Sequence, residues 1–184
     1  MMNQPILSRL IVAALFVGAG SAQAAAPTAA PAPIKPVDVA KLYRGKWIEI
    51  ARTPAKITDG CVAGGTEYVA KTGDRIDLID SCHDQTPAGK LKSIGASGKI
   101  VDPGTNAKLH AVYRFLGFIP VTRDYWVLDH DDGYSWFISA TADFTNFWIY
   151  TRDTHPDPAL VKSLVAEGKA LGYDVTKLEF PAQP

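Results

Sequence analysis

Apolar and polar residues alternate along much of the chain with a period of two, which is typical of β-strands that bury one face. The alternation is clearest in residues 109–115, where the polar residues His110 and Arg114 fall on the same face. The opposite face carries only apolar and aromatic residues, namely Leu109, Ala111, Tyr113 and Phe115. We therefore expect residues 109–115 to form a strand whose apolar face points into the core.

Similar stretches follow one another at a spacing of roughly ten residues and are separated by turn sequences. The turns are expected at residues 72–74, 102–104 and 131–133, which read Thr-Gly-Asp, Asp-Pro-Gly and Asp-Asp-Gly. An antiparallel meander of this kind must close into a barrel or pair into a sandwich to bury its apolar face. The other expected strands are residues 45–52, 66–69, 76–79, 92–101, 124–129, 134–140 and 146–151, with residues 175–180 returning along an edge.

Residues 157–172 carry a helical pattern instead. Asp157 can cap the start of the helix, Pro158 suits its first position, and Gly172 suits the residue just past its end. The apolar residues form one stripe that must dock on an apolar surface, and they are Leu160, Val161, Leu164, Val165 and Leu171. The expected docking surface is the outward face of the strands, with Trp126, Leu128, Trp136 and Ile138. The pattern thus predicts a barrel with one helix on its flank.

Residues 1–24 have the pattern of a cleaved secretory signal. They combine a short polar start containing Arg9, an apolar run over residues 10–19 and a final Ala-Gln-Ala. That run is shorter than a bilayer span, although a membrane anchor is the alternative interpretation. The segment ends in Ala24 and not in a cysteine that could carry a lipid. We expect a periplasmic or secreted protein that is soluble and not lipid-anchored.

Three further regions follow the expected signal. Residues 25–36 are rich in Ala and Pro and lack periodicity, so they are expected to be a flexible linker. Residues 37–184 are expected to form one globular domain, beginning with at most one helical turn over residues 37–43. Lys plus Arg number 19 and Asp plus Glu number 19, and removal of the signal would leave the chain one unit negative. This balance does not favour a nucleic-acid partner or an anionic membrane surface.

The two cysteines, Cys61 and Cys82, predict a disulfide in an exported chain. They flank the turn at residues 72–74, so a hairpin would place them nearly opposite one another. An unstrained bridge there would stabilise the fold by about 3 kcal/mol. The alternative is a metal or redox pair, which is less favoured because the chain has no C-x-x-C motif.

The sequence contains no convincing catalytic set. Its four histidines lie on different segments, and no serine occupies a nucleophile-elbow motif. Residues 129–132, Asp-His-Asp-Asp, could suggest a metal cluster, but they precede Gly133 and fit a solvated turn better. Gly64-Gly65 is not followed by a helix, which excludes a phosphate cradle. We therefore expect no enzyme activity, no cofactor and no metal.

Three short motifs carry a family resemblance. They are Gly-Lys-Trp at residues 45–47 with Glu-Ile-Ala-Arg at 49–52, Arg-Asp-Tyr-Trp-Val-Leu-Asp at 123–129, and Trp-Ile-Tyr-Thr-Arg at 148–152. Together with the late helix and the paired cysteines, they make the chain resemble the lipocalin family, and within it the bacterial lipocalins related to apolipoprotein D. The resemblance extends from about residue 37 to about residue 178.

The resemblance implies an all-β fold, an eight-stranded antiparallel up-and-down barrel with a closed bottom, an open cup and one C-terminal helix packed outside. In such a barrel Trp47 would lie across the closed end, with the guanidinium of Arg152 stacked on its indole. A contact of this kind is worth about 0.5–2 kcal/mol. The signature residues with an expected structural role are Gly45, Trp47, Asp124, Tyr125 and Arg152.

The cup of such a barrel holds one small, largely apolar ligand. The motif register turns Glu49 and Ala51 inward with Trp47. An inward carboxylate is costly unless it is hydrogen-bonded, so Glu49 either orients a ligand head group or belongs to a satisfied internal network. Tyr113 and Tyr125 are its candidate partners. The residues expected to face the ligand are Glu49, Tyr68, Leu109, Ala111, Tyr113, Tyr125, Val127, Phe137, Trp148 and Tyr150.

The leading interpretation is non-catalytic binding or transport of a fatty acid, lysophospholipid or similar amphiphile in the bacterial envelope. The alternatives are a carrier of a tetrapyrrole or other apolar pigment, a lipid-modifying barrel enzyme, and a surface that binds another protein. The connection at residues 115–122 is strongly apolar, so it is expected to be a lid, a membrane-touching lip, or a segment packed on a neighbouring loop. The residues identify neither the ligand nor whether the protein is a monomer or a dimer.

Overall fold

The computed structural model describes residues 27–184. The expected signal sequence, residues 1–24, lies outside this part of the chain. Within residues 27–184 no helix is both long and apolar enough to cross a bilayer.

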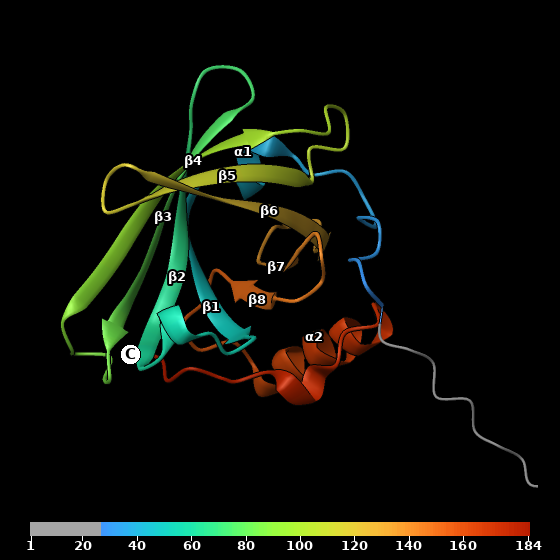
Figure 1. Cartoon of the computed structure of the whole chain (residues 1–184). Helices are drawn as coiled ribbons and strands as arrows, with labels where there is room; N and C mark the ends of the chain where they lie inside the picture. The colour runs from blue at the N-terminus through green and yellow to red at the C-terminus, as the bar shows by residue number, and fades with distance from the viewer. Residues whose placement is uncertain (1–26) are drawn as a thin grey trace, which may run out of the picture.

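Eight antiparallel strands form a closed up-and-down barrel, as the sequence predicted (Figure 1). Each strand pairs with the next along the chain, and the first pairs with the last, so every strand has two neighbours. The strands are β1 (Gly45–Arg52), β2 (Cys61–Ala70), β3 (Arg75–Asp84), β4 (Leu91–Ile100), β5 (Lys108–Phe115), β6 (Ile119–His130), β7 (Trp136–Thr141) and β8 (Phe147–Thr151). The turns expected at residues 72–74, 102–104 and 131–133 are confirmed as connections between strands.

Two hydrophobic clusters lie on the two sides of the barrel wall. One fills the interior and includes Trp47, Leu78, Leu109 and Phe137. The other lies outside the wall, between the strands and the C-terminal helix. Ala51 belongs to the outer cluster, so the expectation that it points inward with Trp47 was wrong. A β-bulge between Glu49 and Ala51 reverses the alternation at that point.

Helix α2 (Pro158–Ala170) is confirmed where the sequence placed it. The carboxylate of Asp157 accepts from the Ala159 amide at 2.7 Å, which caps the first turn. The helix packs with Leu160, Leu164, Val165 and Leu171 against the predicted docking residues Trp126, Leu128, Trp136 and Ile138. Gly168 allows this close approach, because a Cβ there would lie 2.8 Å from the ring of Phe147.

The segment expected to be a flexible linker lies against the barrel over residues 30–36. The amides of Ala30 and Ile34 donate to the carbonyls of Ala142 and Leu128, and Ala30 is buried in the outer cluster. Paired backbone groups and a buried side chain hold this stretch in place, although its composition suggested otherwise. Helix α1 (Val39–Leu42) follows as the single turn that was expected.

The C-terminal segment differs from the strand expected at residues 175–180. Residues Val175–Lys177 form the 3₁₀ turn η2, and only Glu179 makes a bridge, with Arg52 of β1. Further on, the carbonyl of Ala182 accepts from the amide of Ala63 at 2.7 Å. The tail therefore satisfies backbone groups of β1 and β2 in the half of the barrel where these two strands no longer pair.

Trp47 and Arg152 close one end of the barrel. The indole of Trp47 is fully buried, and its Nε1 donates to the carbonyl of Leu42 at 2.8 Å. The guanidinium carbon of Arg152 lies 3.5 Å from the ring centroid, as the resemblance implied. The same guanidinium donates to three carbonyls at this end, those of Lys41, Arg44 and Lys46.

The predicted disulfide between Cys61 and Cys82 is present. It joins the first residue of β2 to a residue near the end of β3, at the open end of the barrel. The bridge therefore ties together two strands beside the split between β1 and β2.

Replacing Arg152 with Lys keeps the positive charge but removes the planar group that stacks on Trp47 and donates to three carbonyls. We expect the free energy of unfolding, measured by chemical denaturation, to fall by about 1–3 kcal/mol. Arg75→Lys, at an exposed position on β3, is the charge-matched control and should stay within about 0.5 kcal/mol of wild type. Equal effects of the two substitutions would contradict the role given to Arg152.

Candidate ligand-binding site

The ten residues expected to face the ligand all occupy the barrel interior. Nine of them belong to the interior cluster or pack against it, and Glu49 is buried beside it. Period-two alternation accounts for this agreement, because it places every second residue of a barrel strand inside. Ligand contact itself stays a prediction for each of them.

The closed half of the interior is filled by aromatic rings. The ring of Phe137 packs edge-on against Trp47 at 4.7 Å between centroids and stacks on Tyr150 at the same distance. Tyr68 meets Tyr43 edge-on at 5.4 Å. These rings form the packed bottom of the barrel.

Partly exposed side chains lie above this bottom. Tyr125 and Trp148 are only half-buried, and their rings meet edge-on at 5.6 Å. The alternation along β4, β5 and β6 turns Ile94, Phe115 and Ile119 toward the same space nearer the mouth. By this alternation the upper half of the barrel has aromatic side chains at its base and apolar side chains toward its open end, and we call this region the cup.

A hydroxyl and carboxylate cluster on the cup floor centres on Asp80. Its two carboxylate oxygens accept from Thr66 Oγ1 and from the Tyr113 hydroxyl, each at 2.6 Å. The Tyr113 and Tyr125 hydroxyls are 3.0 Å apart. Burial raises the pKa of Asp80, and the hydrogen bonds from Thr66 and Tyr113 oppose that rise.

Asp80 was not among the expected site residues, because the strand at residues 76–79 was expected to end at Ile79. Strand β3 runs on to Asp84, and its inward face continues from Ile76 and Leu78 to Asp80. Extending the two-residue period by one step would have found this residue.

A buried ion pair lies beside the cluster. Arg52 Nη1 donates to Glu49 Oε1 at 2.6 Å, and both side chains are nearly inaccessible to solvent. The other donors of Arg52 reach the carboxylate of Glu179 and the carbonyls of Thr58 and Cys61. The bulge in β1 makes this possible, because without it residues three apart on a strand would face opposite sides.

This pairing corrects the expected partners of Glu49. Tyr113 and Tyr125 were the candidates, but the hydroxyl of Tyr113 binds Asp80 and Tyr125 instead. Burial raises the pKa of Glu49 to about 7, although Arg52 acts in the opposite direction.

The signature residues lie at the wall and the ends of the barrel. Gly45 begins β1 with a positive φ of 60° beside Arg152. Asp124 points outward from β6 and contacts His110 Nδ1 at 2.7 Å. Tyr125, by contrast, reaches the cup floor, so it belongs to the candidate site as well as to the signature.

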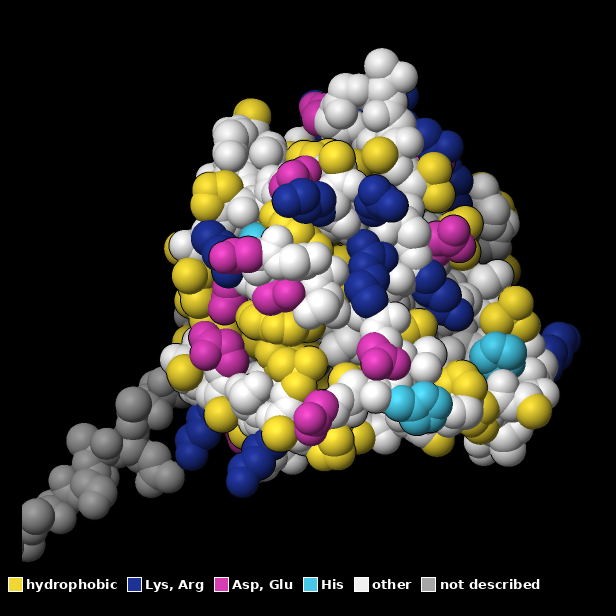
Figure 2. Space-filling model, turned by 180° about the vertical axis from the view of Figure 1, so that it is seen from behind, with side chains coloured by type: hydrophobic (Ala, Val, Ile, Leu, Met, Phe, Trp, Pro, Cys, Tyr) yellow, Lys and Arg dark blue, Asp and Glu magenta, His cyan; other side chains and the backbone are white. Residues whose placement is uncertain are grey.

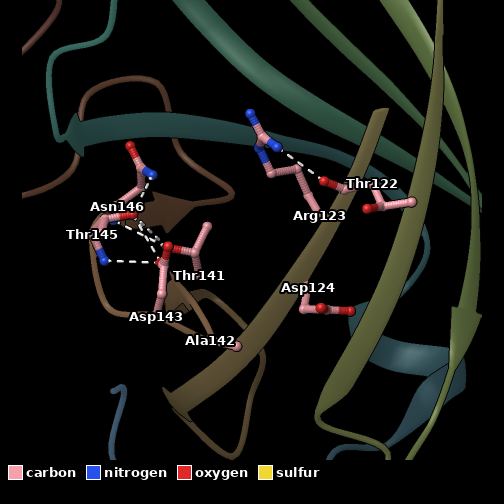
Figure 3. Close-up of a pocket in the computed structure, with 8 residues that line it drawn as sticks. All are labelled: Thr122, Arg123, Asp124, Thr141, Ala142, Asp143, Thr145 and Asn146. Atoms are coloured by element: carbon pink, nitrogen blue, oxygen red, sulfur yellow. Dashed lines mark hydrogen bonds between the residues drawn. The ribbon is translucent and has the colours of Figure 1, made fainter. Parts of the chain in front are cut away.

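A cavity of about 370 Å³ opens at the rim between β6 and the β7–β8 turn (Figure 3). Arg123 and Asp124 leave β6 on opposite sides, and Arg123 donates to the carbonyl of Thr122. Across the cavity, the carboxylate of Asp143 accepts from Thr141 and Thr145 and shapes the turn. This polar rim lies on the same edge of the barrel as the cup mouth.

The hairpin between β5 and β6 projects from the barrel (Figure 1), and its tip carries exposed apolar side chains. Phe115, Leu116, Phe118 and Ile119 are 53%, 68%, 71% and 42% exposed, so they do not pack on a neighbouring loop as one interpretation held. Elsewhere apolar side chains reach the surface among charges of both signs (Figure 2). The hairpin tip is thus an apolar patch beside the cup mouth.

The side chains at residues 129–132 organise a turn. The carboxylate of Asp131 accepts from the Ser135 amide and hydroxyl and from the Trp136 amide. His130 is buried and stacks on Tyr134 at 4.5 Å. Within residues 27–184 no group of three or more His, Cys, Asp or Glu side chains is arranged to hold a metal ion.

The raised pKa of Glu49 predicts a pH-dependent stability. The folded state holds the proton of the Glu49 carboxyl group more tightly than the unfolded state does. Protonated Glu49 therefore stabilises the fold fully below its unfolded pKa of 4.5, and this stabilisation is lost as the pH rises through about 7. Glu49→Gln cannot titrate, so its free energy of unfolding relative to wild type should rise by about 1–3 kcal/mol between about pH 5 and pH 8. Chemical denaturation of Glu49→Gln and of wild type at both pH values measures this difference in the free energy of unfolding.

The matched control is Glu67→Gln, an exposed position on β2. Its free energy of unfolding relative to wild type should change little over the same pH range. A flat profile for Glu49→Gln as well would show that Glu49 is ionised in the folded protein throughout.

Comparison with known proteins agrees with this geometry. Residues 37–183 match the family described as "Lipocalin-like domain". Temperature-induced lipocalin-1 of Arabidopsis thaliana is 31% identical over 142 residues, which cover 74% of this chain and 74% of that protein. Outer membrane lipoprotein Blc of Vibrio cholerae is 22% identical over 156 residues, covering 83% and 88%.

A solved structure gives the same picture of the fold. Insecticyanin from the tobacco hornworm Manduca sexta superposes with a TM-score of 0.65 at 18% identity, covering 86% of this chain and 88% of that one. The family match over residues 37–183 contains all three sequence motifs. The chain belongs to the lipocalin family.

Proposed function

We propose that this protein binds one small, largely apolar amphiphile in the cup of its barrel and carries it without chemical change. The observation that carries the proposal is the construction of the cup, in which half-buried Tyr125 and Trp148 lie above a packed bottom and beneath an apolar wall. Proteins of the lipocalin family bind small hydrophobic molecules, and family membership supports the same use here. A fatty acid, a lysophospholipid or a similar lipid has the shape that such a cup accepts.

The proposed place of action is outside the cytoplasm, in the bacterial envelope or after secretion. The disulfide between Cys61 and Cys82 supports this, because such bonds persist in oxidising compartments. The signal-like pattern of residues 1–24 supports it independently.

Native mass spectrometry of protein purified from its own host tests the proposed function. We expect a bound species that organic extraction removes and that contains an acyl or alkyl chain. Absorbance at about 400 nm would instead favour a tetrapyrrole carrier. An empty cup together with turnover of a lipid substrate would favour an enzyme and contradict the proposal.

We also propose that the hairpin tip touches the lipid bilayer from which the ligand is taken or to which it is delivered. Leu116 and Phe118 are the most exposed large side chains of the hairpin, and they lie beside the cup mouth. Burying each of them in the interface would contribute about 1.5–3 kcal/mol. The exposed Arg114 next to the tip would favour anionic lipids.

The double variant Leu116→Ser with Phe118→Ser should bind mixed phosphatidylcholine and phosphatidylglycerol vesicles at least about tenfold more weakly than wild type in a sedimentation assay. Val101→Ser is the control, since Val101 is 51% exposed on the opposite end of the barrel. Unchanged vesicle binding by the double variant would rule out a membrane-touching tip.

A further inference from the structure

At the cup floor, the acidic side chains outnumber the basic ones. Glu49 and Arg52 form an ion pair, and Arg52 also binds Glu179, so the positive charge of Arg52 is fully compensated. Asp80 faces the same interior, and within residues 27–184 it makes no ion pair with a Lys, Arg or His side chain. The cup floor therefore carries one carboxylate without a counter-ion.

The hydroxyl groups around Asp80 are directed toward it. Tyr113 donates to one carboxylate oxygen, so at its own oxygen it accepts from the Tyr125 hydroxyl 3.0 Å away. Thr66 donates to the other carboxylate oxygen. These donated hydrogen bonds stabilise a negative charge on Asp80 and oppose the burial that raises its pKa.

Asp80 is partly exposed, and its position on β3 turns it toward the barrel interior. It is not among the fully buried side chains, and it lies beside Tyr125, which is also partly exposed. Aromatic faces next to a carboxylate favour a cation, since the ring quadrupole and the negative charge act in the same direction. A ligand could thus supply the missing positive charge at this position.

An anionic head group on the cup floor would lack a hydrogen-bond donor there. All the polar atoms of the Arg52 guanidinium already contact Glu49, Glu179 or the carbonyls of Thr58 and Cys61. The other inward arginine, Arg123, lies at the exposed rim. A ligand carboxylate would therefore meet Asp80 on the floor without compensation.

We infer that the cup selects ligands with a positively charged ammonium group on an apolar chain, and that this group binds the carboxylate of Asp80 on the cup floor. The inference rests on the proposed function and deepens it, because it names the chemical class of the ligand. It disfavours a free fatty acid as the ligand.

The test uses three probes with the same chain length, namely dodecylamine and dodecanoate below their critical micelle concentrations and dodecanol below its solubility limit. Their dissociation constants are measured at about pH 7, where the amine is protonated and the acid ionised. Quenching of tryptophan fluorescence is a suitable signal because Trp148 lines the cup. Wild type should bind dodecylamine at least about tenfold more tightly than dodecanol, and dodecanoate more weakly than dodecanol.

Asp80→Asn should remove the preference for the amine while keeping the dissociation constant of dodecanol within about threefold of wild type. The matched control is Asp77→Asn, on the outward face of the same strand, where Asp77 pairs with Lys71 at 3.0 Å. It should retain the wild-type order of affinities. An amine preference that survives in Asp80→Asn would overturn the inference.

The remaining outcomes separate this inference from the proposed function. If dodecanol binds but wild type prefers dodecanoate or treats all three probes alike, the inference fails and the proposed function stands. If none of the probes binds, the proposed function fails. Should Asp80→Asn not fold, the wild-type order still decides, and Tyr113→Phe, which removes one donor to Asp80, should reduce the amine preference in part.

Discussion

The closure of the barrel through β1 is the constraint on which the rest of the structure depends. This strand must pair with β2 on one side and β8 on the other, and it does so over different parts of its length. Its first half pairs with β2, where Gly65 lets the strands approach so closely that a Cβ would lie 2.0 Å from the carbonyl oxygen of Trp47. Of the two neighbouring strands, its second half pairs only with β8, across a bulge.

Two features of the open end follow from this division. The backbone groups that β1 and β2 leave unpaired are met in part by the C-terminal tail, through Glu179 and Ala182. The bulge turns Arg52 inward, beside Glu49, so that a buried ion pair forms next to the cup. The same element that closes the barrel therefore sets the charges in its interior, and leaves Asp80 as the carboxylate without a cation.

The barrel interior divides into a tightly packed half and a partly exposed half for a physical reason. Near Trp47 the aromatic rings pack at centroid distances of 4.7 Å, and the side chain of Phe137 is fully buried. Above them the hydroxyls of Tyr113 and Tyr125 need polar partners and find them in Asp80 and each other. The polar layer thus lies at the boundary between the packed bottom and the cup.

The sequence by itself determined the strand order, the turns, the helix, the disulfide and the inward face of most strands, because alternation, turn residues and caps are local properties of the chain. The tertiary structure alone decided what depended on non-local contacts. The bulge that turns Ala51 outward, the docking of residues 30–36 and the path of the tail all satisfy backbone groups on distant strands. The partners of Glu49 and of Asp80 also depend on which strands meet across the barrel, and no local pattern specifies that.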